Sequence, residues 1–274
     1  MKAVAVIGYK NTGKTTFVCR LVEKLALKGR VGTVKIMQDH RFDSPEKDTG
    51  KHFDSGAENV TAVSEEGVIS IQREGGLGEA LEILADRGMD YAIVEGATNS
   101  DLPKIMLGEM EDEVENVVLR LAPCSDWDME EVTGIVQQTS EIVTLNGMIN
   151  KIRHIPEFPL TGSIGTFTGV VRGQTDDIST KMLEFEKYET VADERIEKIC
   201  NDLKQRDGII EVLIHHKSGR LMRGEDIVYI VVASAHRREL FKALSDAIER
   251  VKSEVPIWKK EVTMEGDFWV HDHA

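Results

Sequence analysis

Residues 227–261 read IVYIVVASAHRRELFKALSDAIERVKSEVPIWKKE and decide how the second half of the chain folds. The apolar, β-forming run Ile227–Val232 predicts a strand that is covered on both faces. After Ser234, the expected N-cap, apolar residues recur at three- and four-residue steps, which predicts a helix that Pro256 ends. The apolar stripe consists of Leu240, Phe241, Leu244, Ile248, Val251 and Val255.

Basic side chains gather at both ends of this predicted helix. They are His236, Arg237 and Arg238 in the first turn, Lys252 in the last turn, and Lys259 and Lys260 beyond Pro256. Cations in a first turn oppose the helix dipole, a cost that a bound phosphate or carboxylate offsets. We therefore expect an anion site there, with a solvated surface as the alternative. A lysine near a helix C-terminus is, taken singly, equally well explained by dipole compensation.

The rest of this half mixes strands and helices. Apolar runs predict strands over residues 142–149, 165–171, 182–188 and 209–215, and a helical period predicts a helix over 191–206. Because these elements show no βαβ rhythm, we expect an α+β domain over residues 141–274.

The first half opens with a phosphate-binding motif. The apolar strand Ala3–Ile7 leads into Gly8-Tyr9-Lys10-Asn11-Thr12-Gly13-Lys14-Thr15-Thr16, which fits G-x-x-x-x-G-K-[ST] and precedes an amphipathic helix to about Leu27. In such a loop the glycines let backbone amides surround the β-phosphate, the lysine reaches the β and γ oxygens, and the first threonine binds Mg²⁺. The predicted nucleotide-binding residues are Gly8, Asn11, Thr12, Gly13, Lys14, Thr15 and Thr16.

A second feature of this half is the apolar strand Asp90–Gly96, which ends in an acid. We expect Glu95 to hold Mg²⁺ or its water, and a turn or cap residue is the alternative. Further strands are predicted over 31–36, 60–63, 68–72 and 117–121, and helices over 78–87 and 128–139. Residues 37–54 are expected to form a polar loop, in which Asp39 and His40 offer too few ligands for zinc. Residues 1–140 are thus predicted to form an α/β P-loop NTPase-like domain with a mostly parallel sheet.

Composition limits the classes of partner. A chain of 274 residues has room for two domains. Residues 1–140 hold 15 Lys and Arg against 25 Asp and Glu, and residues 141–274 hold 19 against 23, so the net charge of −14 divides into −10 and −4. This charge argues against nucleic-acid binding. The three distant cysteines, the lack of a targeting segment and the lack of a membrane-length apolar run predict a cytoplasmic protein with reduced thiols and no membrane association.

The first half resembles the GTP-binding adaptor family of molybdopterin-guanine dinucleotide biosynthesis. The matching segments, in the family's order, are Gly8–Thr16, Lys35, Asp39-His40, Lys47-Asp48, Ser55-Gly56-Ala57, Val94-Glu95-Gly96 and Leu102-Pro103-Lys104. The resemblance implies GTP with Mg²⁺ as ligands and a molybdopterin guanylyltransferase as a partner. The family's histidine-rich loop is reduced here to Gln38-Asp39-His40-Arg41, and Ala97-Thr98 replaces an aromatic-basic pair.

The second half resembles the large catalytic subunit of molybdopterin synthase. The matches are Thr166-Phe167-Thr168-Gly169, Arg172, Ser234-Ala235-His236-Arg237, Lys252, Pro256, Trp258-Lys259 and Glu265-Gly266-Asp267 with Trp269. The resemblance implies sulfur transfer to cyclic pyranopterin monophosphate, without a cofactor, from the thiocarboxylated C-terminus of a small ubiquitin-like carrier. It implies catalytic roles for Lys252 and Lys259, and substrate contacts from Arg172, His236, Arg237, Lys260 and Glu261. Val170 and Phe268 stand where the family often has basic residues.

The spacing along the predicted helix suggests a shared site. His236 and Lys252 are separated by about 24 Å at 1.5 Å per residue, which exceeds the length of a pterin. We therefore expect a homodimer in which His236 and Arg237 of one protomer face Arg172, Lys252 and Lys259 of its partner.

Two other functions are compatible with the motifs. One is a P-loop NTPase or small-molecule kinase whose C-terminal domain only binds a ligand, and the other is a non-enzymatic nucleotide-binding adaptor with a degenerate synthase domain. Formation of molybdopterin without nucleotide would distinguish both of these from the leading hypothesis, a fusion of a GTP-binding adaptor domain with a sulfur-transferring synthase domain.

Overall fold

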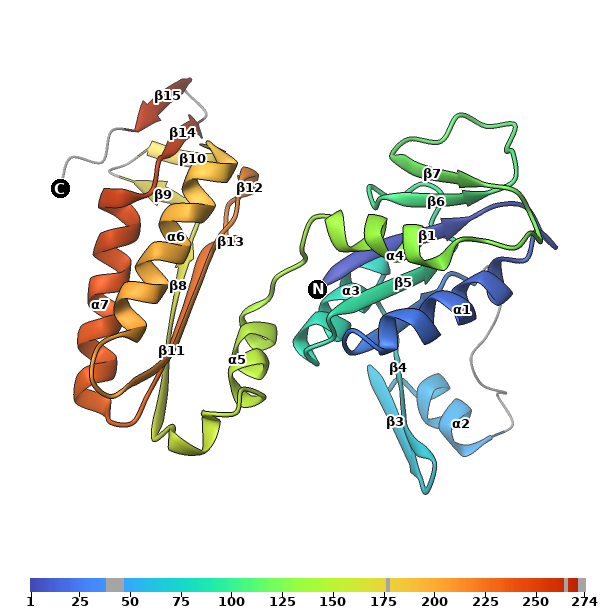
Figure 1. Cartoon of the computed structure of the whole chain (residues 1–274), viewed down its shortest axis with the longest axis horizontal. Helices are drawn as coiled ribbons and strands as arrows, with labels where there is room; N and C mark the ends of the chain where they lie inside the picture. Colours follow the sequence, from blue (N-terminus) through green and yellow to red (C-terminus); the bar gives the residue numbers. More distant parts are fainter. Residues whose placement is uncertain (38–46, 176–177, 264–265, 271–274) are drawn as a thin grey trace. The chain divides into compact units, whose positions relative to one another are not determined.

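The structure is a computed structural model that describes residues 1–37, 47–175, 178–263 and 266–270 (Figure 1). The predicted features at Gln38-Asp39-His40-Arg41 and at Glu265 lie outside the described residues. The chain divides into two compact units, Met1–Ile142 and Val143–Ala274. None of the helices in the described ranges combines the length and the hydropathy that a bilayer crossing requires.

A five-stranded parallel sheet forms the centre of the first unit. Its strand order is β2 (Val31–Lys35), β5 (Tyr91–Glu95), β1 (Lys2–Ile7), β6 (Lys104–Leu107) and β7 (Val117–Leu121). Helices α1 (Lys14–Ala26) and α4 (Met129–Gln138) pack on one face, against Val4, Val6 and Ile93. Helix α3 (Leu77–Asp86) packs on the other face, against Ala92 and Val94. The prediction of a mostly parallel sheet is confirmed.

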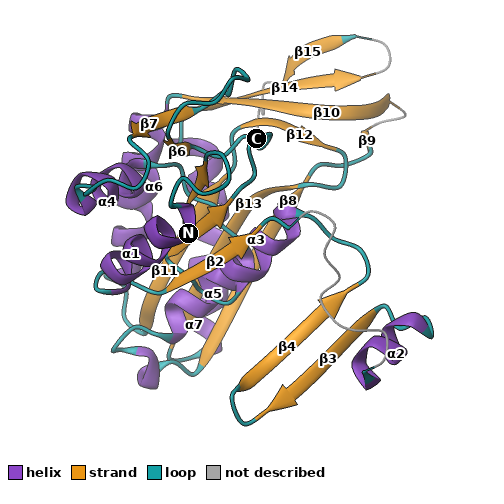
Figure 2. Cartoon of the chain, turned by 90° about the vertical axis from the view of Figure 1, so that its right-hand side faces the viewer, coloured by secondary structure: helices purple, strands orange, loops and turns teal. Residues whose placement is uncertain are grey.

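A hairpin and a short helix extend this unit. Strands β3 (Asn59–Ser64) and β4 (Gly67–Gln72) pair antiparallel, and α2 (Asp48–Asp54) lies beside β3 (Figure 2). The Arg73 guanidinium lies 4.4 Å from the centre of the Phe53 ring and donates to the Ala57 carbonyl at 3.2 Å. The prediction of a polar loop through Asp54 is therefore wrong for residues 48–54, because a helix of seven residues is too short to show an apolar period in the sequence.

The second unit has a three-stranded antiparallel sheet in the order β11 (Ile209–His216), β13 (Asp226–Ser234) and β8 (Ser163–Val170). Helices α6 (Glu189–Lys204) and α7 (Arg237–Glu254) cover one face, where Ile230 and Val232 point (Figure 1). Helix α5 (Leu145–Arg153) covers the opposite face, against Tyr229 and Val231. The central strand is thus covered on both faces, as its apolar sequence predicts.

A second sheet completes this unit. Its order is β12 (Gly219–Met222), β10 (Ile178–Lys187), β14 (Ile257–Thr263) and β15 (Asp267–Val270), and β9 (Gln174–Thr175) also pairs with β10. A single 3₁₀ turn, Phe158–Leu160, precedes β8. The inner face of the sheet includes the buried apolar side chains Leu183, Phe185 and Leu221.

Two local predictions are wrong. The strand expected over 142–149 is α5, because Thr144 caps a helix by accepting a hydrogen bond from the Gly147 amide at 3.1 Å. Ser234 is not the N-cap of α7, because it is still paired in β13 and its hydroxyl donates to the His236 carbonyl at 2.8 Å. His236 is the N-cap instead, and α7 begins at Arg237.

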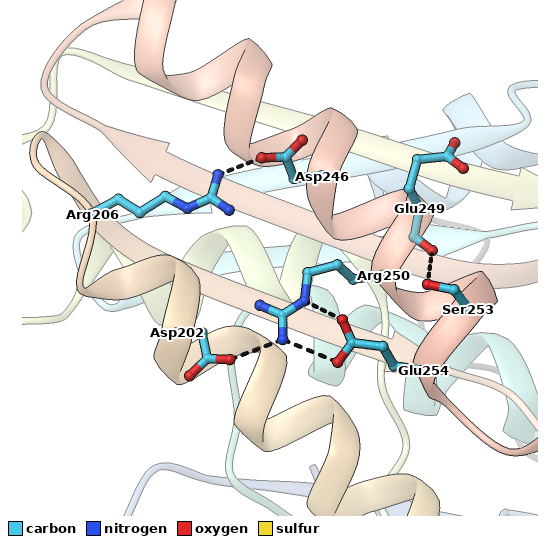
Figure 3. A network of polar contacts seen from close by, with 7 residues as sticks. All are labelled: Asp202, Arg206, Asp246, Glu249, Arg250, Ser253 and Glu254. Atoms are coloured by element: carbon cyan, nitrogen blue, oxygen red, sulfur yellow. Dashed lines mark hydrogen bonds and ion pairs between the residues drawn. The ribbon is translucent and has the colours of Figure 1, made fainter.

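Helices α6 and α7 are joined by an ionic network (Figure 3). Arg250 of α7 donates to Asp202 of α6 at 2.8 Å and to Glu254 of its own helix at 2.5 Å. Arg206, just after α6, donates to Asp246 of α7 at 2.5 Å. The hydrogen bonds that Arg250 donates to Glu254 and Asp202 raise the pKa of Arg250, and the bond from Arg250 lowers the pKa of Glu254. These contacts hold the two helices side by side.

Candidate functional site

The first candidate site is the loop between β1 and α1. Gly13 has a φ of 88°, and Asn11 has a φ of 68°. A Cβ on Gly8 would lie 2.5 Å from the Leu107 carbonyl oxygen, so only glycine allows this approach to β6. The loop leads directly into α1, whose N-cap is Gly13, so free backbone amides face the place where phosphate is expected.

Three side chains meet at the sheet edge beside this loop. The Thr15 hydroxyl donates to Glu95 Oε1 at 3.0 Å, and Lys35 Nζ lies 3.2 Å from the same oxygen. Thr15 lies in the first turn of α1. Glu95 and Lys35 are the last residues of the neighbouring strands β5 and β2, and they lie opposite each other. The parallel sheet therefore brings the two predicted Mg²⁺ ligands into contact.

The predicted phosphate-binding lysine is the first residue of α1. Lys14 Nζ donates to the Gly8 carbonyl at 2.8 Å and to the Tyr9 carbonyl at 2.6 Å. Burial lowers the pKa of Lys14, Glu95 opposes this effect, and Lys35 adds to it. Thr12 donates to the Tyr9 carbonyl at 2.9 Å, while Thr16 is exposed on the first turn of α1.

The oxygen donors at this edge fit a magnesium ion. Mg²⁺ takes one or two protein oxygens and completes its shell with phosphate oxygens and water, and it would neutralise charge on the phosphates. Thr15 and Glu95 would hold it. Within the described ranges, no group of three or more His, Cys, Asp or Glu side chains forms a larger metal site.

Two lysines of this unit belong to the segments that resemble the adaptor family but were not predicted to be site residues. The contact of Lys35 with Glu95 becomes visible only when the strand order places β2 beside β5. Lys104 is 1% exposed and donates to the carbonyls of Leu102 at 3.2 Å and Glu115 at 3.0 Å. It thereby ties the segment that follows Glu95 to the start of β7.

The second candidate site lies on β14. Lys259 and Glu261 stand opposite Phe185 and Leu183 of β10, so they share the inner face of the sheet. Glu261 is buried and accepts a hydrogen bond from the Thr180 hydroxyl. The predicted residues Lys259 and Glu261 are therefore neighbours on one face.

Lys260 points the other way. It stands opposite Glu184 on the outer face and forms an ion pair of 3.0 Å with Asp267. A strand alternates its side chains, so consecutive residues cannot share a face. The structure thus separates Lys260 from Lys259 and Glu261, although all three were predicted to form one pocket.

Arg172 lies in the turn between β8 and β9. Backbone hydrogen bonds from the Val171 amide to the Glu225 carbonyl at 2.9 Å and from the Gly224 amide to the Val171 carbonyl at 3.0 Å fix this turn. The side chain of Arg172 is exposed. A rigid backbone with an exposed guanidinium suits forked hydrogen bonding to a phosphate.

His236, Arg237 and Lys252 occupy the ends of α7. His236 and Arg237 are exposed at its N-terminus, and Lys252 is exposed in its last turn. Because sixteen helical steps span about 24 Å, these groups cannot contact one small substrate within one protomer. Glu239 in the first turn also offsets part of the positive charge there.

Each half of the chain matches a known protein family. The MoaE protein family matches residues 138–254, and the family of Molybdopterin guanine dinucleotide synthesis protein B, abbreviated MobB, matches residues 3–123. A probable molybdopterin synthase from Haloferax volcanii is 34% identical over 270 residues, or 97% of this chain and 99% of the relative. The molybdopterin synthase catalytic subunit of Pyrococcus abyssi is 40% identical over 110 residues, or 40% of this chain and 74% of that subunit. A crystal structure of molybdopterin synthase from Staphylococcus aureus is 35% identical, covers 41% of this chain and 82% of that chain, and has a TM-score of 0.39.

Proposed function

We propose that one polypeptide serves two steps of molybdenum cofactor biosynthesis. The chain belongs to the molybdopterin synthase family, and in its sequence a MobB domain precedes the MoaE domain. The observation that carries this proposal is the end-to-end match to the Haloferax relative, which includes both halves of the chain. We assign residues 1–140 to nucleotide binding and residues 141–274 to sulfur transfer.

The synthase domain converts cyclic pyranopterin monophosphate to molybdopterin. The sulfur comes from the C-terminal thiocarboxylate of a separate small carrier, and two rounds build the dithiolene. In each round a carbon–sulfur bond to the pterin replaces a carbon–oxygen bond, whose oxygen leaves as water or with the opening cyclic phosphate. Water then cleaves the acyl–sulfur bond, and the carrier leaves as a carboxylate. Arg172 binds the phosphate, and Lys259, beside the buried Glu261, stabilises negative charge where sulfur is delivered.

The separation along α7 supports a site shared by two protomers. His236 and Arg237 of one chain would complete the pocket formed by Arg172, Lys252 and Lys259 of its partner. Lys260 is paired with Asp267 on the outer face and contributes only its positive charge from outside this pocket. The small carrier docks where its C-terminus reaches Lys259.

The N-terminal domain binds GTP with Mg²⁺ and supports formation of the guanine dinucleotide cofactor by a molybdopterin guanylyltransferase. The contact between Thr15 and Glu95, with Lys14 in the same loop, supports a nucleoside triphosphate as ligand. Both steps take place in the cytoplasm, where the thiols of Cys19, Cys124 and Cys200 stay unpaired.

A reconstitution tests the proposal. The full chain is mixed with cyclic pyranopterin monophosphate and the thiocarboxylated carrier, with and without GTP, and molybdopterin is quantified. We expect product in both reactions and none with a carrier that ends in a carboxylate. Nucleotide hydrolysis without molybdopterin formation would favour an NTPase or kinase instead, and GTP binding without sulfur transfer would favour an adaptor. Calorimetry with GTP and ATP, each with Mg²⁺, measures base preference separately.

A further inference from the structure

Strand β10 has one extra residue where it pairs with β14. Met182 stands opposite Val262, but Thr180 stands opposite Thr263, so Lys181 is the additional residue of a bulge. In an uninterrupted strand Thr180 would share the outer face of Met182. The extra residue reverses the alternation and turns Thr180 to the inner face, on which Leu183 lies. Thr180 is accordingly 3% exposed, whereas Lys181 is exposed to solvent.

Thr180 contacts two segments of the candidate site at once. Its hydroxyl donates to Glu261 Oε1, and its amide donates to the Gly173 carbonyl at 3.2 Å. Gly173 directly follows Arg172, and Glu261 is two residues from Lys259 on the same face of β14. Thr180 therefore links the turn that has the arginine to the strand that has the lysine.

The surroundings of Glu261 make the hydroxyl important. Glu261 is 7% exposed on a face with the buried apolar side chains Leu183 and Phe185. A buried carboxylate in an apolar environment is stable only when a donor satisfies it, and removing that donor leaves its desolvation uncompensated. Loss of the Thr180 hydroxyl would thus free Glu261 to move and would loosen the two linked segments.

We propose that Thr180, turned inward by the bulge at Lys181, is a positioning residue that fixes the Arg172 turn relative to Lys259 and Glu261 during sulfur transfer. The inference rests on the proposed function of the C-terminal domain. Thr180 makes no contact with the substrate in this role, so its effect must appear through the position of Arg172 relative to Lys259 and Glu261.

Thr180→Val tests this role because valine keeps the shape of threonine and removes the hydroxyl. We expect the KM for cyclic pyranopterin monophosphate to rise about 10-fold to 100-fold, the scale expected for a small misplacement of a positioning group. Hydrogen exchange over residues 171–175 should become faster. Thr180→Ser should restore both values, and Ser179→Ala, at the adjacent exposed position, should match the wild type.

A double-mutant cycle shows whether Thr180 acts through Arg172. On an Arg172→Ala background, Thr180→Val should raise KM little further, because the group that it positions is gone. Equal effects on both backgrounds would overturn the inference, as would an unchanged KM and unchanged exchange in Thr180→Val. If Thr180→Val does not fold, Thr180→Cys retains a weak donor and should show an intermediate KM; a wild-type KM in that variant would also overturn the inference.

The two levels of failure are distinct. A wild-type chain that forms no molybdopterin would overturn the proposed function itself. If the wild type forms molybdopterin and Thr180→Val has the wild-type KM and hydrogen exchange, only the role of Thr180 would be overturned.

Discussion

The nucleotide site and the predicted sulfur-transfer site are built in different ways. In the first unit nearly all predicted residues lie in one continuous segment, Gly8–Thr16, and a single parallel strand adds Glu95. In the second unit the predicted residues lie on a turn, at both ends of a helix and on a strand, from Arg172 to Glu261. A local motif fixes the first geometry, whereas strand register fixes the second. We therefore expect the two sites to respond independently to substitution.

Lys259→Ala should have the largest effect. Removing an ammonium that stabilises negative charge where sulfur is delivered should lower the rate of sulfur transfer by about 10²-fold to 10³-fold. Binding of GTP should be unchanged, because the nucleotide loop lies in the other unit. Molybdopterin formation and calorimetry on the same preparation measure both. Lys242→Ala, at an exposed position in α7, is the control.

A comparable loss of GTP binding in Lys259→Ala would break the comparison, since it would mean that the two sites are coupled. Normal sulfur transfer would instead remove Lys259 from the site.

Lys14→Ala is the reciprocal experiment. Loss of a charge-assisted hydrogen bond to phosphate should weaken GTP binding by roughly 10-fold to 100-fold. Sulfur transfer without nucleotide should be unaffected. The neighbouring Lys10→Ala, at an exposed position of the loop, controls for a general loss of positive charge. Equal weakening in both variants would show that charge alone, and not the position of Lys14, binds the phosphates.

The same difference explains what the sequence could predict. The P-loop motif predicted the position of Lys14 and Thr15 because the residues that shape the loop are adjacent in the chain. The inward and outward faces of Lys259 and Lys260 could not be predicted, because they depend on pairing with β10. The bulge at Lys181 has no local signal, and it alone decides where Thr180 points.

Errors in the predicted elements have a similar origin. The apolar run at 142–149 suggested a strand, yet Leu145, Met148 and Ile152 also have helical spacing, and the Thr144 cap decides between the two. The segment Ile257–Thr263 alternates charged and apolar residues too irregularly to predict a strand, and it forms one because β10 and β15 pair with it on both sides.

Acid should destabilise the second unit through His216, the last residue of β11. Its Nδ1 lies 2.7 Å from the Lys217 carbonyl, which can only accept, so Nδ1 has the proton. Burial lowers the pKa of His216 below 6.5, the hydrogen bond with the Lys217 carbonyl opposes this effect, and Lys187 adds to the lowering. When the pH falls below 6.5, the ordinary pKa, His216 binds a proton in the unfolded chain but remains neutral in the folded chain until the pH reaches its lowered pKa. The second unit should therefore lose stability as pH falls from 7 through 6.5 toward the lowered pKa.

Thermal unfolding of the full chain between pH 7 and pH 5 measures this loss. His216→Gln, which keeps a donor but does not titrate, should flatten the dependence, whereas His154→Gln at an exposed position should leave it intact. A wild-type slope in His216→Gln would show that other groups govern the acid response.

The ionic network between α6 and α7 should have the smallest effect, because its ion pairs are partly exposed to solvent. Arg250→Met keeps the aliphatic part of the side chain and removes the contacts to Asp202 and Glu254. Partly exposed ion pairs of this kind contribute about 0.5–1 kcal/mol, and salt screens them, so the loss should shrink at high ionic strength. Arg195→Met, at an exposed position in α6, is the control. His236 and Lys252 lie at the two ends of α7. If Arg250→Met lowers the rate of sulfur transfer under conditions in which the protein remains folded, the network also sets the position of this helix. Unchanged sulfur transfer, measured beside urea unfolding, would show that the positions of these two side chains depend on the sheet and its apolar core instead.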